Sequence, residues 1–276
     1  MSYNQKKIKL NNESYMPNIG FGTSMITGME CIETIKKALK IGYRHIDTAA
    51  AYENEFEIGQ AIMQSNLKRS DIFITSKVWK DSMGYDNTIK SLNNTLKNLN
   101  LEYIDLFLIH WPKNYDDKLN IDTWKALEKL YKEGKARAIG VSNFLENHLK
   151  IILDNCDILP AVDQIEFHPG LMRNTTRKVC DKNNIVVEAW SPLGKGKMLK
   201  NETLIKIAKK YNKSVAQLCL KWCLQNNVVP LPKSQNEERM KQNLDLFDFE
   251  ISDEDIYLLN NMQFFDGSNM DPNTFN

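Results

Sequence analysis

Residues 42–59 read GYRHIDTAAAYENEFEIG, and within this one stretch the pattern changes from that of a strand to that of a helix. The first half alternates apolar and polar residues, and from Glu53 onward the spacing predicts a helix. Asp47 lies inside the apolar run, and Tyr52 follows it in the predicted connection. A buried strand that leads directly into a helix indicates an α/β fold, and it raises the question of why that strand carries an acid.

The same unit recurs along the chain. Apolar runs predict eight strands, at residues 19–22, 45–48, 72–75, 104–109, 138–141, 161–165, 185–189 and 228–231. Most are separated by helical periodicity, as in residues 31–42, 87–100, 122–134 and 203–212. Gly42 and Gly134 stand where helices would end, and Asp122 and Ser214 where helices would begin. Near-continuous apolar strands alternating with helices predict a parallel sheet.

Eight such units favour a (β/α)8 TIM barrel, whose usual length is about 250 residues. The alternative is an open doubly wound sheet, which usually carries G-x-G-x-x-G after its first strand. Gly20-Phe21-Gly22 has no third glycine in place, and residues 194–196 follow a late strand. Residues 7–16 alternate around Asn11-Asn12 and predict an N-terminal β-hairpin. We expect one domain over residues 1–276, ending in a short irregular tail from residue 264.

Composition excludes several classes of protein. The 276 residues carry a net charge of +1, with 42% hydrophobic and 26% charged residues, so no strong field would attract nucleic acid or an anionic membrane. No apolar run approaches the ~20 residues of a membrane helix, and the N-terminus lacks the apolar core of a signal peptide. We expect a cytoplasmic monomer that binds neither nucleic acid nor membrane.

Five cysteines at wide spacing argue against a disulfide framework. Cys219 and Cys223 lie four residues apart on a predicted helix and could share a metal. No further cysteine or histidine stands at ligand spacing, so two buried thiols are the preferred interpretation and no metal site is predicted.

Polar or aromatic residues occur at the ends of nearly all the predicted strands, where barrel enzymes place their chemistry. In chain order they are Asp47, Lys77, His110, Ser142, Asn143, Gln164, Trp190, Ser191, Lys233 and Ser234. Each alone has a structural explanation: a core histidine, a lysine reaching solvent, a helix cap, a turn or a space-filling ring. Their convergence on one rim favours a functional site.

Four of these residues suggest acid–base chemistry. A phenol has a pKa near ~10, which is high for a proton donor at neutral pH. We expect the Lys77 ammonium to lower the pKa of Tyr52, and Asp47 to keep Lys77 charged and oriented. His110 could hydrogen-bond the oxygen that receives the proton, or relay the proton. This arrangement would protonate a carbonyl oxygen, and the hydride would have to come from a nicotinamide cofactor.

Three separated motifs give the chain a resemblance to the aldo-keto reductase superfamily, covering Gly20 to Asn243. They are residues 42–59, KARAIGVSNF at 135–144 and LPKSQNEERMKQN at 231–243, and LIHWP at 108–112 and EAWSPLG at 188–194 agree. The chain looks most like the bacterial and protozoal branch called 2,5-diketo-D-gluconate reductases or prostaglandin F synthases. The resemblance implies a (β/α)8 barrel that binds NADPH without a Rossmann domain, with Asp47, Tyr52, Lys77 and His110 as catalytic residues.

The resemblance also implies a set of cofactor contacts. Gly22 and Thr23 would line the cofactor site; Ser142, Asn143 and Gln164 would hold the nicotinamide carboxamide, and Trp190 would stack on the ring where many relatives have Tyr. Ser191, Leu193 and Lys195 would follow the pyrophosphate, and Lys233, Ser234 and Arg239 would hold the 2′-phosphate. Asn243 and Gln242 would reach the adenine, although many relatives have Glu at the position of Gln242. A solvated helix face is the alternative for Lys233, Arg239 and Lys241.

Met25, Trp79 and Trp111 are the candidates for the wall of a substrate pocket, and aromatic walls suit small carbonyl compounds. The short segment after His110 and the short tail predict an open pocket with broad selectivity. We therefore expect an NADPH-dependent reductase of aldehydes and ketones. The alternatives are an NADPH-binding sensor or structural protein with little catalysis and, ranked last, a barrel lyase or metal hydrolase.

Overall fold

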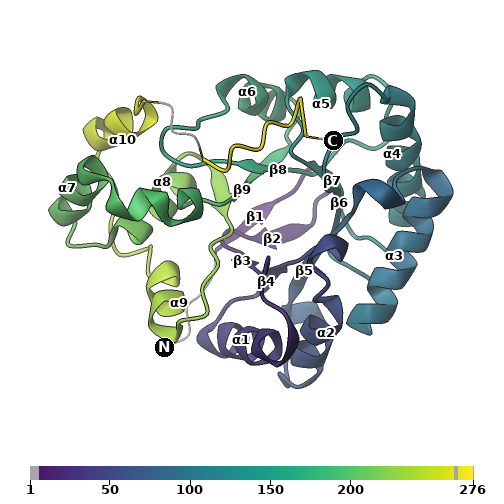
Figure 1. Cartoon of the computed structure of the whole chain (residues 1–276), viewed down its shortest axis with the longest axis horizontal. Helices are drawn as coiled ribbons and strands as arrows, with labels where there is room; N and C mark the ends of the chain where they lie inside the picture. The colour runs from purple at the N-terminus through teal and green to yellow at the C-terminus, as the bar shows by residue number, and fades with distance from the viewer. Residues whose placement is uncertain (1–5, 264–266, 276) are drawn as a thin grey trace.

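The computed structural model describes residues 6–263 and 267–275, and its centre is a ring of parallel strands surrounded by helices (Figure 1). The strands are β3 (Phe21–Gly22), β4 (His45–Asp47), β5 (Phe73–Val78), β6 (Leu106–Ile109), β7 (Ile139–Ser142), β8 (Val162–Glu166), β9 (Val186–Trp190) and β10 (Val228–Pro230). Each overlaps one of the eight predicted runs.

The strands pair in chain order, each parallel to the next, from β3 to β10. Backbone hydrogen bonds also join the first strand to the last: Gly20 N donates to Pro230 O at 3.0 Å, and Gly22 N donates to Pro232 O at 3.1 Å. The predicted (β/α)8 barrel is therefore confirmed, and the open doubly wound sheet is excluded.

Helices follow the strands and cover the outside of the barrel (Figure 1). They are α1 (Gly28–Ile41), α2 (Glu55–Met63), α3 (Tyr85–Leu99), α4 (Asp117–Lys132), α5 (Glu146–Leu153), α6 (Asn174–Lys182), α7 (Glu202–Lys210), α8 (Val215–Gln225), α9 (Glu237–Leu244) and α10 (Asp253–Asn260). Short 3-10 turns occur at η1 (Ala50–Tyr52), η2 (Arg69–Asp71), η3 (Lys80–Ser82) and η4 (Gly194–Lys200).

The predicted helix boundaries are confirmed in part. Ser214 caps α8 in a capping box, and Gly42 ends α1 at a φ of 129°, a backbone conformation that favours glycine. The predicted start at Asp122 is wrong, because α4 begins five residues earlier. Asp116 is the N-cap and accepts a hydrogen bond from Leu119 N at 3.0 Å, so Asp122 lies within the helix.

The predicted N-terminal hairpin consists of β1 (Lys7–Lys9) and β2 (Tyr15–Pro17), paired antiparallel. Leu10 and Met16 are buried against Leu106, Leu108 and other apolar side chains near the starts of the barrel strands. The hairpin therefore closes the amino-terminal end of the barrel, and the chemistry of this fold is left to the opposite end.

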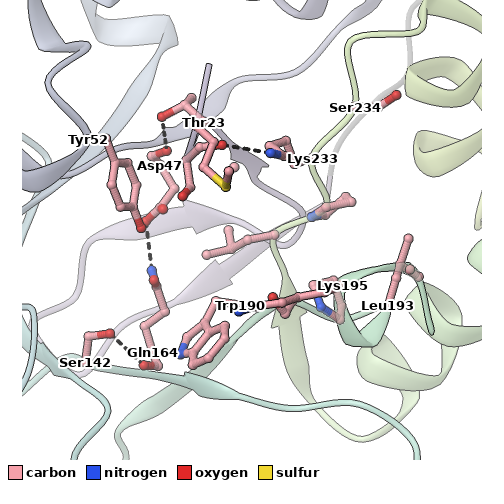
Figure 2. A pocket seen from close by; sticks show the side chains of 18 of the residues that line it. Thr23, Asp47, Tyr52, Ser142, Gln164, Trp190, Leu193, Lys195, Lys233 and Ser234 are labelled. Atoms are coloured by element: carbon pink, nitrogen blue, oxygen red, sulfur yellow. Dashed lines mark hydrogen bonds between the residues drawn. The ribbon is translucent and has the colours of Figure 1, made fainter. Parts of the chain in front are cut away.

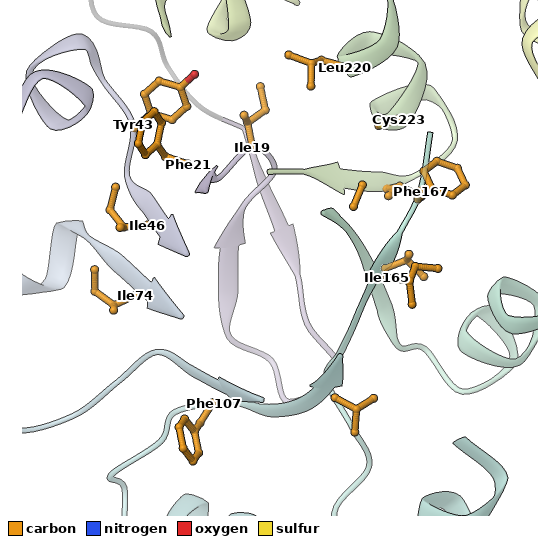
Figure 3. Packing of buried hydrophobic residues seen from close by; sticks show 14 of the residues in the cluster. Ile19, Phe21, Tyr43, Ile46, Ile74, Phe107, Ile165, Phe167, Leu220 and Cys223 are labelled. Atoms are coloured by element: carbon orange, nitrogen blue, oxygen red, sulfur yellow. The ribbon is translucent and has the colours of Figure 1, made fainter. Parts of the chain in front are cut away.

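Side chains along each strand alternate between the barrel interior and the helices. Ile46, Ile74 and Phe107 belong to the large apolar cluster under the helices, part of which Figure 3 shows. Their neighbours on the strands face inward. The hairpin fills the amino-terminal end of the barrel, and toward the carboxyl ends of the strands the inward residues become polar. A polar layer inside an otherwise apolar barrel costs free energy unless its members bind one another, so it indicates a site.

One strand is longer than predicted, and the difference concerns the site. Strand β5 continues through Lys77 to Val78, so Lys77 lies within the strand and its side chain is fully buried. The expectation that Lys77 follows the strand is therefore wrong. A lysine can remain inside because a carboxylate on the neighbouring strand compensates its charge.

Cys219 and Cys223 are both fully buried in α8, as preferred from the sequence, and burial raises the pKa of Cys219 to about 12. Within residues 6–263 and 267–275, no three His, Cys, Asp or Glu side chains are grouped as metal ligands. Among the same residues, no helix has the length and apolar character needed to cross a membrane.

Candidate active site

A cavity of about 1580 Å³ opens at the carboxyl ends of the strands, where the sequence predicts the site. The predicted site residues that line it are Gly22, Thr23, Met25, Asp47, Tyr52, Trp79, His110, Trp111, Ser142, Asn143, Gln164, Trp190, Ser191, Leu193, Lys195, Lys233, Ser234, Arg239, Gln242 and Asn243. Lys77 is the one predicted site residue outside this lining, and it lies beneath Asp47.

Asp47 and Lys77 form a buried ion pair between strands β4 and β5. Lys77 Nζ donates to both carboxylate oxygens of Asp47 and to the carbonyl oxygen of Thr48, each at 2.8 Å. Burial works to lower the pKa of Lys77, but Asp47, aided by Tyr52, outweighs burial, so the pKa lies above its usual value. The ammonium group is therefore charged at neutral pH and held in one place.

Tyr52 lies in η1, on the loop that follows β4. Asn54 holds this loop: its Nδ2 donates to Thr23 O at 3.0 Å and to Ile26 O at 2.8 Å, and its Oδ1 accepts from Thr48 at 2.6 Å. The phenol ring is thereby placed over Lys77, whose Nζ lies 5.3 Å from the ring centroid. Sequence spacing brings Tyr52 near the strand end, and this polar loop places it above the barrel.

The direction of the Tyr52 pKa differs from the expectation. Burial raises the pKa of Tyr52 above its usual value, and the charge of Lys77 opposes that rise without reversing it. Desolvation of the phenolate outweighs the attraction of one ammonium group. Tyr52 therefore holds its proton at neutral pH, with the ammonium group of Lys77 beside its ring.

His110 follows β6 and faces Tyr52 across the cavity floor. The centroids of the two rings are 5.6 Å apart, and the Trp79 ring lies 5.0 Å from His110. Burial lowers the pKa of His110 well below its usual value, and Lys77 and Lys80 add to the shift. His110 is therefore neutral, so it can donate or accept a hydrogen bond without bringing a charge.

Side chains from β7, β8 and β9 form a hydrogen-bonded row along the opposite wall. Ser142 Oγ donates to Gln164 O at 2.8 Å, and Asn143 Nδ2 donates to His110 O at 2.9 Å. Trp190 Nε1 donates to Asn143 Oδ1 at 2.7 Å. Gln164 Nε2 donates to Asp47 Oδ2 at 2.8 Å, so the row is connected directly to the buried ion pair (Figure 2).

The other end of the cavity is cationic. Lys195, Lys233 and Arg239 line it and are exposed, and Lys233 Nζ donates to the carbonyl oxygen of Ser24 at 2.8 Å. Figure 2 shows Lys195 and Ser234 on the side away from Tyr52. A long cavity with cations at one end and amide, hydroxyl and indole groups at the other fits a phosphorylated dinucleotide, whose phosphates and flat ring need those groups.

The predicted substrate residues lie on different sides of the mouth. Trp79 contacts His110, and Trp111 lies 6.5 Å from Trp190, centroid to centroid, whereas Met25 is 86% exposed on the loop after β3. Residues 264–266 and 276 of the predicted tail lie outside the described residues. The Phe275 ring packs on Trp111 at 4.1 Å, so the described tail contacts the mouth instead of leaving it fully open.

Sequence reasoning did not identify three features of this site. Met270 of the tail lines the cavity, and so do Ser214, Val215 and Ala216 at the start of α8. Glu188 is fully buried beneath Gln164 and accepts its hydrogen bond at 2.9 Å. Glu188 is an acid within an apolar run, as Asp47 is, and the same pattern could have identified it from the sequence.

A family model for the aldo/keto reductase family matches residues 18–263. Glyoxal reductase of Bacillus subtilis (strain 168) is 50% identical over 250 residues, which are 90% of each chain. The 9,11-endoperoxide prostaglandin H2 reductase of Trypanosoma cruzi (strain CL Brener) is 44% identical over 260 residues, 93% of this chain and 91% of that one.

Similarity to solved structures indicates the same family. A variant of Gox0644 crystallised in complex with NADPH superposes with a TM-score of 0.93 at 38% identity, covering 99% of both chains. The chain belongs to the aldo-keto reductase family. It is accordingly an NADPH-dependent oxidoreductase, and the resemblance noted in the sequence is confirmed.

Proposed function

We propose that the protein reduces small aldehydes and ketones to alcohols, with Tyr52 as the proton donor. The observation that carries this proposal is the arrangement of Tyr52 above the Lys77–Asp47 ion pair and beside a neutral His110, at the floor of the cavity. When bound, NADPH supplies the hydride for carbonyl reduction. The side chains of this chain have to orient the carbonyl group and deliver one proton to its oxygen.

Tyr52 acts as the general acid. The proton stays on the phenol at neutral pH, and the charge of Lys77, which opposes the rise in the pKa of Tyr52 caused by burial, stabilises the phenolate as the proton leaves. Asp47 keeps that ammonium charged and in position. His110 is uncharged and borders the same space, where it hydrogen-bonds the carbonyl oxygen and orients it toward Tyr52. In the reverse direction Tyr52 is the base.

The cofactor contacts follow from the two ends of the cavity. Ser142, Asn143 and Gln164 hold the carboxamide, and the Trp190 indole covers the nicotinamide ring; Gly22 and Thr23 complete this end. The pyrophosphate lies along Ser191, Leu193 and Lys195. The 2′-phosphate is held by Lys233, Ser234 and Arg239, and the adenine is bordered by Gln242 and Asn243. All of them line the one cavity, which supports a single extended binding site.

Small carbonyl compounds fit the wall formed by Trp79 and Trp111, and Met25 lines the same cavity. Such apolar and aromatic surface accepts short carbon chains without demanding specific hydrogen bonds. The names of the two relatives point to a dicarbonyl and to a lipid endoperoxide as substrates of those proteins. Glyoxal and methylglyoxal are therefore the first substrates to test, together with simple aldehydes and sugars.

The test compares the wild-type protein with a Tyr52→Phe variant. Loss of NADPH absorbance measures turnover, and quenching of tryptophan fluorescence measures NADPH binding. We expect turnover to fall at least about 100-fold in the variant, because general acid catalysis contributes that much or more, while binding changes less than about twofold. Near-normal turnover by the variant would exclude Tyr52 as the donor. Tight binding by the wild type without turnover on any carbonyl would favour a cofactor-binding sensor.

A further inference from the structure

Glu188 on β9 is a second acid inside the barrel, and the proposed reaction does not use it. Its side chain is fully buried. Oε2 accepts a hydrogen bond from Gln164 Nε2 at 2.9 Å, whereas Oε1 has no hydrogen-bond partner among the described residues and lies 3.8 Å from His45 Nε2. A buried carboxyl with one unpaired oxygen costs stability, so its presence beneath the cavity calls for a function.

The amide of Gln164 lies between two carboxyl groups. Its nitrogen donates to Asp47 Oδ2 at 2.8 Å and to Glu188 Oε2 at 2.9 Å. An amide nitrogen carries two hydrogens, and these two acceptors use both. Turning the amide over would place its oxygen against two carboxyl oxygens. The orientation of Gln164 is therefore determined, and its own carbonyl oxygen is the polar atom left for the cavity that Gln164 lines.

Glu188 can accept this bond whether or not it is ionised. Burial raises the pKa of Glu188 to about 8, with a contribution from Asp47, whereas Gln164 and Lys77 oppose the rise. The groups that face it are His45 and Asp47 from β4, Lys77 from β5 and Gln164 from β8. A proton on Oε1 leaves Oε2 free to accept, so the layer holds a single ion pair at neutral pH.

We propose that Glu188 is a positioning residue which, together with Asp47, orients the Gln164 amide so that its oxygen receives the amino group of the nicotinamide carboxamide. The inference rests on the proposed role of Gln164 in cofactor binding. Glu188 does not line the cavity, so in this role it touches neither cofactor nor substrate. It makes the site selective for a hydrogen-bond donor at that point, because an oxygen with no alternative orientation can only accept.

Two substitutions separate this role from a structural one. Glu188→Met keeps the bulk but removes the acceptor, and Glu188→Gln keeps an acceptor oxygen. We expect the dissociation constant for NADPH, measured by tryptophan quenching, to rise about 5- to 10-fold in the Met variant and less than about 2-fold in the Gln variant. Thermal unfolding should show some loss of stability in the Met variant, because one N–H group of Gln164 loses its acceptor. A purely structural role predicts that loss of stability with unchanged affinity.

A ligand analogue tests the orientation itself. In 3-acetylpyridine adenine dinucleotide phosphate a methyl group replaces the carboxamide amino group, so the donor is absent. We expect wild type and Glu188→Gln to bind NADP⁺ more tightly than the analogue, and Glu188→Met to discriminate about 5-fold less between them. Should the Met variant fold poorly, Glu188→Asp withdraws the acceptor by one methylene and should show the same loss.

The outcomes distinguish the two proposals. If wild type binds NADPH but does not discriminate between NADP⁺ and the analogue, the proposed role of Gln164 fails and the inference fails with it. If wild type discriminates and Glu188→Met discriminates equally, only the role of Glu188 is overturned. Equal loss of affinity in the Met and Gln variants would also overturn it, because the Gln variant retains the acceptor.

Discussion

Lys77 Nζ lies 2.8 Å from each carboxylate oxygen of Asp47, and both side chains are buried inside the barrel. The two residues come from neighbouring strands, so the ion pair is part of the barrel wall and cannot move without it. This buried ion pair explains why an acid occupies a buried strand: Asp47 compensates the charge of Lys77, a lysine of the proposed site.

Lys77→Met should destabilise the protein strongly and remove its activity. The substitution leaves Asp47 buried without its cation, which costs about 3–5 kcal/mol of unfolding free energy. The double variant Asp47→Asn/Lys77→Met should regain stability but not turnover. Urea unfolding with a reductase assay measures both. Lys150→Met is the control: Lys150 pairs with Asp154 at 2.6 Å and the two side chains are 74% and 57% exposed, so it should cost at most about 1 kcal/mol. Equal losses in the two single variants would contradict the prediction.

Arg239→Ala should weaken NADPH binding about 10- to 100-fold and NADH binding less than about 2-fold. A charge-assisted hydrogen bond to the 2′-phosphate is lost, and NADH lacks that phosphate. Fluorescence titration with each cofactor measures the two affinities. Lys241→Ala is the matched control on α9, because Lys241 Nζ already pairs with Glu237 at 3.0 Å and Glu238 at 2.9 Å. If Lys241→Ala weakens NADPH binding as much as Arg239→Ala, the phosphate is held elsewhere.

Glu188→Gln should change how stability depends on pH. Burial raises the folded-state pKa of Glu188 to about 8 from an ordinary value of 4.5, so its favourable contribution is complete below pH 4.5 and is lost as pH rises toward 8. The unfolding free energies of wild type and variant can be measured at intervals from pH 4.5 to 9. As pH rises, the wild type should lose stability relative to the variant, by up to about 1.4 kcal/mol per pH unit. The other groups are common to both proteins and cancel. A pH-independent difference would show that Glu188 is ionised throughout.

Phe275→Ala should raise KM for small carbonyl substrates about 2- to 10-fold without changing NADPH affinity. The Phe275 ring packs on Trp111 at 4.1 Å, and an aromatic pair of this kind contributes about 0.5–1.5 kcal/mol. Without it Trp111 is held less firmly at the mouth. Steady-state kinetics with glyoxal or a simple aldehyde measures KM. Tyr115→Ala, at a ring that is 94% exposed, should leave KM unchanged. Unchanged KM in Phe275→Ala would mean that the tail does not shape the pocket.

Local pattern was enough to predict the architecture. Each of the eight apolar runs overlaps a barrel strand, and the hairpin, the cap at Ser214 and the two buried cysteines of α8 are where the sequence indicates. Periodicity and capping depend on residues close together in the chain, so they can be read from it directly. The rule that barrel chemistry lies at the carboxyl ends of strands then located the candidate site residues.

Features that depend on contacts across the barrel could not be predicted in the same way. The sequence could not show that Lys77 lies within β5, or that burial raises the pKa of Tyr52 by more than the charge of Lys77 lowers it. It also could not show that Phe275 packs on Trp111. The helix start at Asp116 instead of Asp122 shows that several acids near a boundary compete as caps.

The sequence by itself determined the order of strands and helices, the family and the residues able to do acid–base chemistry. Only the tertiary structure decided how Asp47, Lys77, Gln164 and Glu188 share their hydrogen bonds, because these residues come from four strands and meet only when the barrel closes. Burial and charge act through space, so the protonation of such groups depends on neighbours that are distant in the chain.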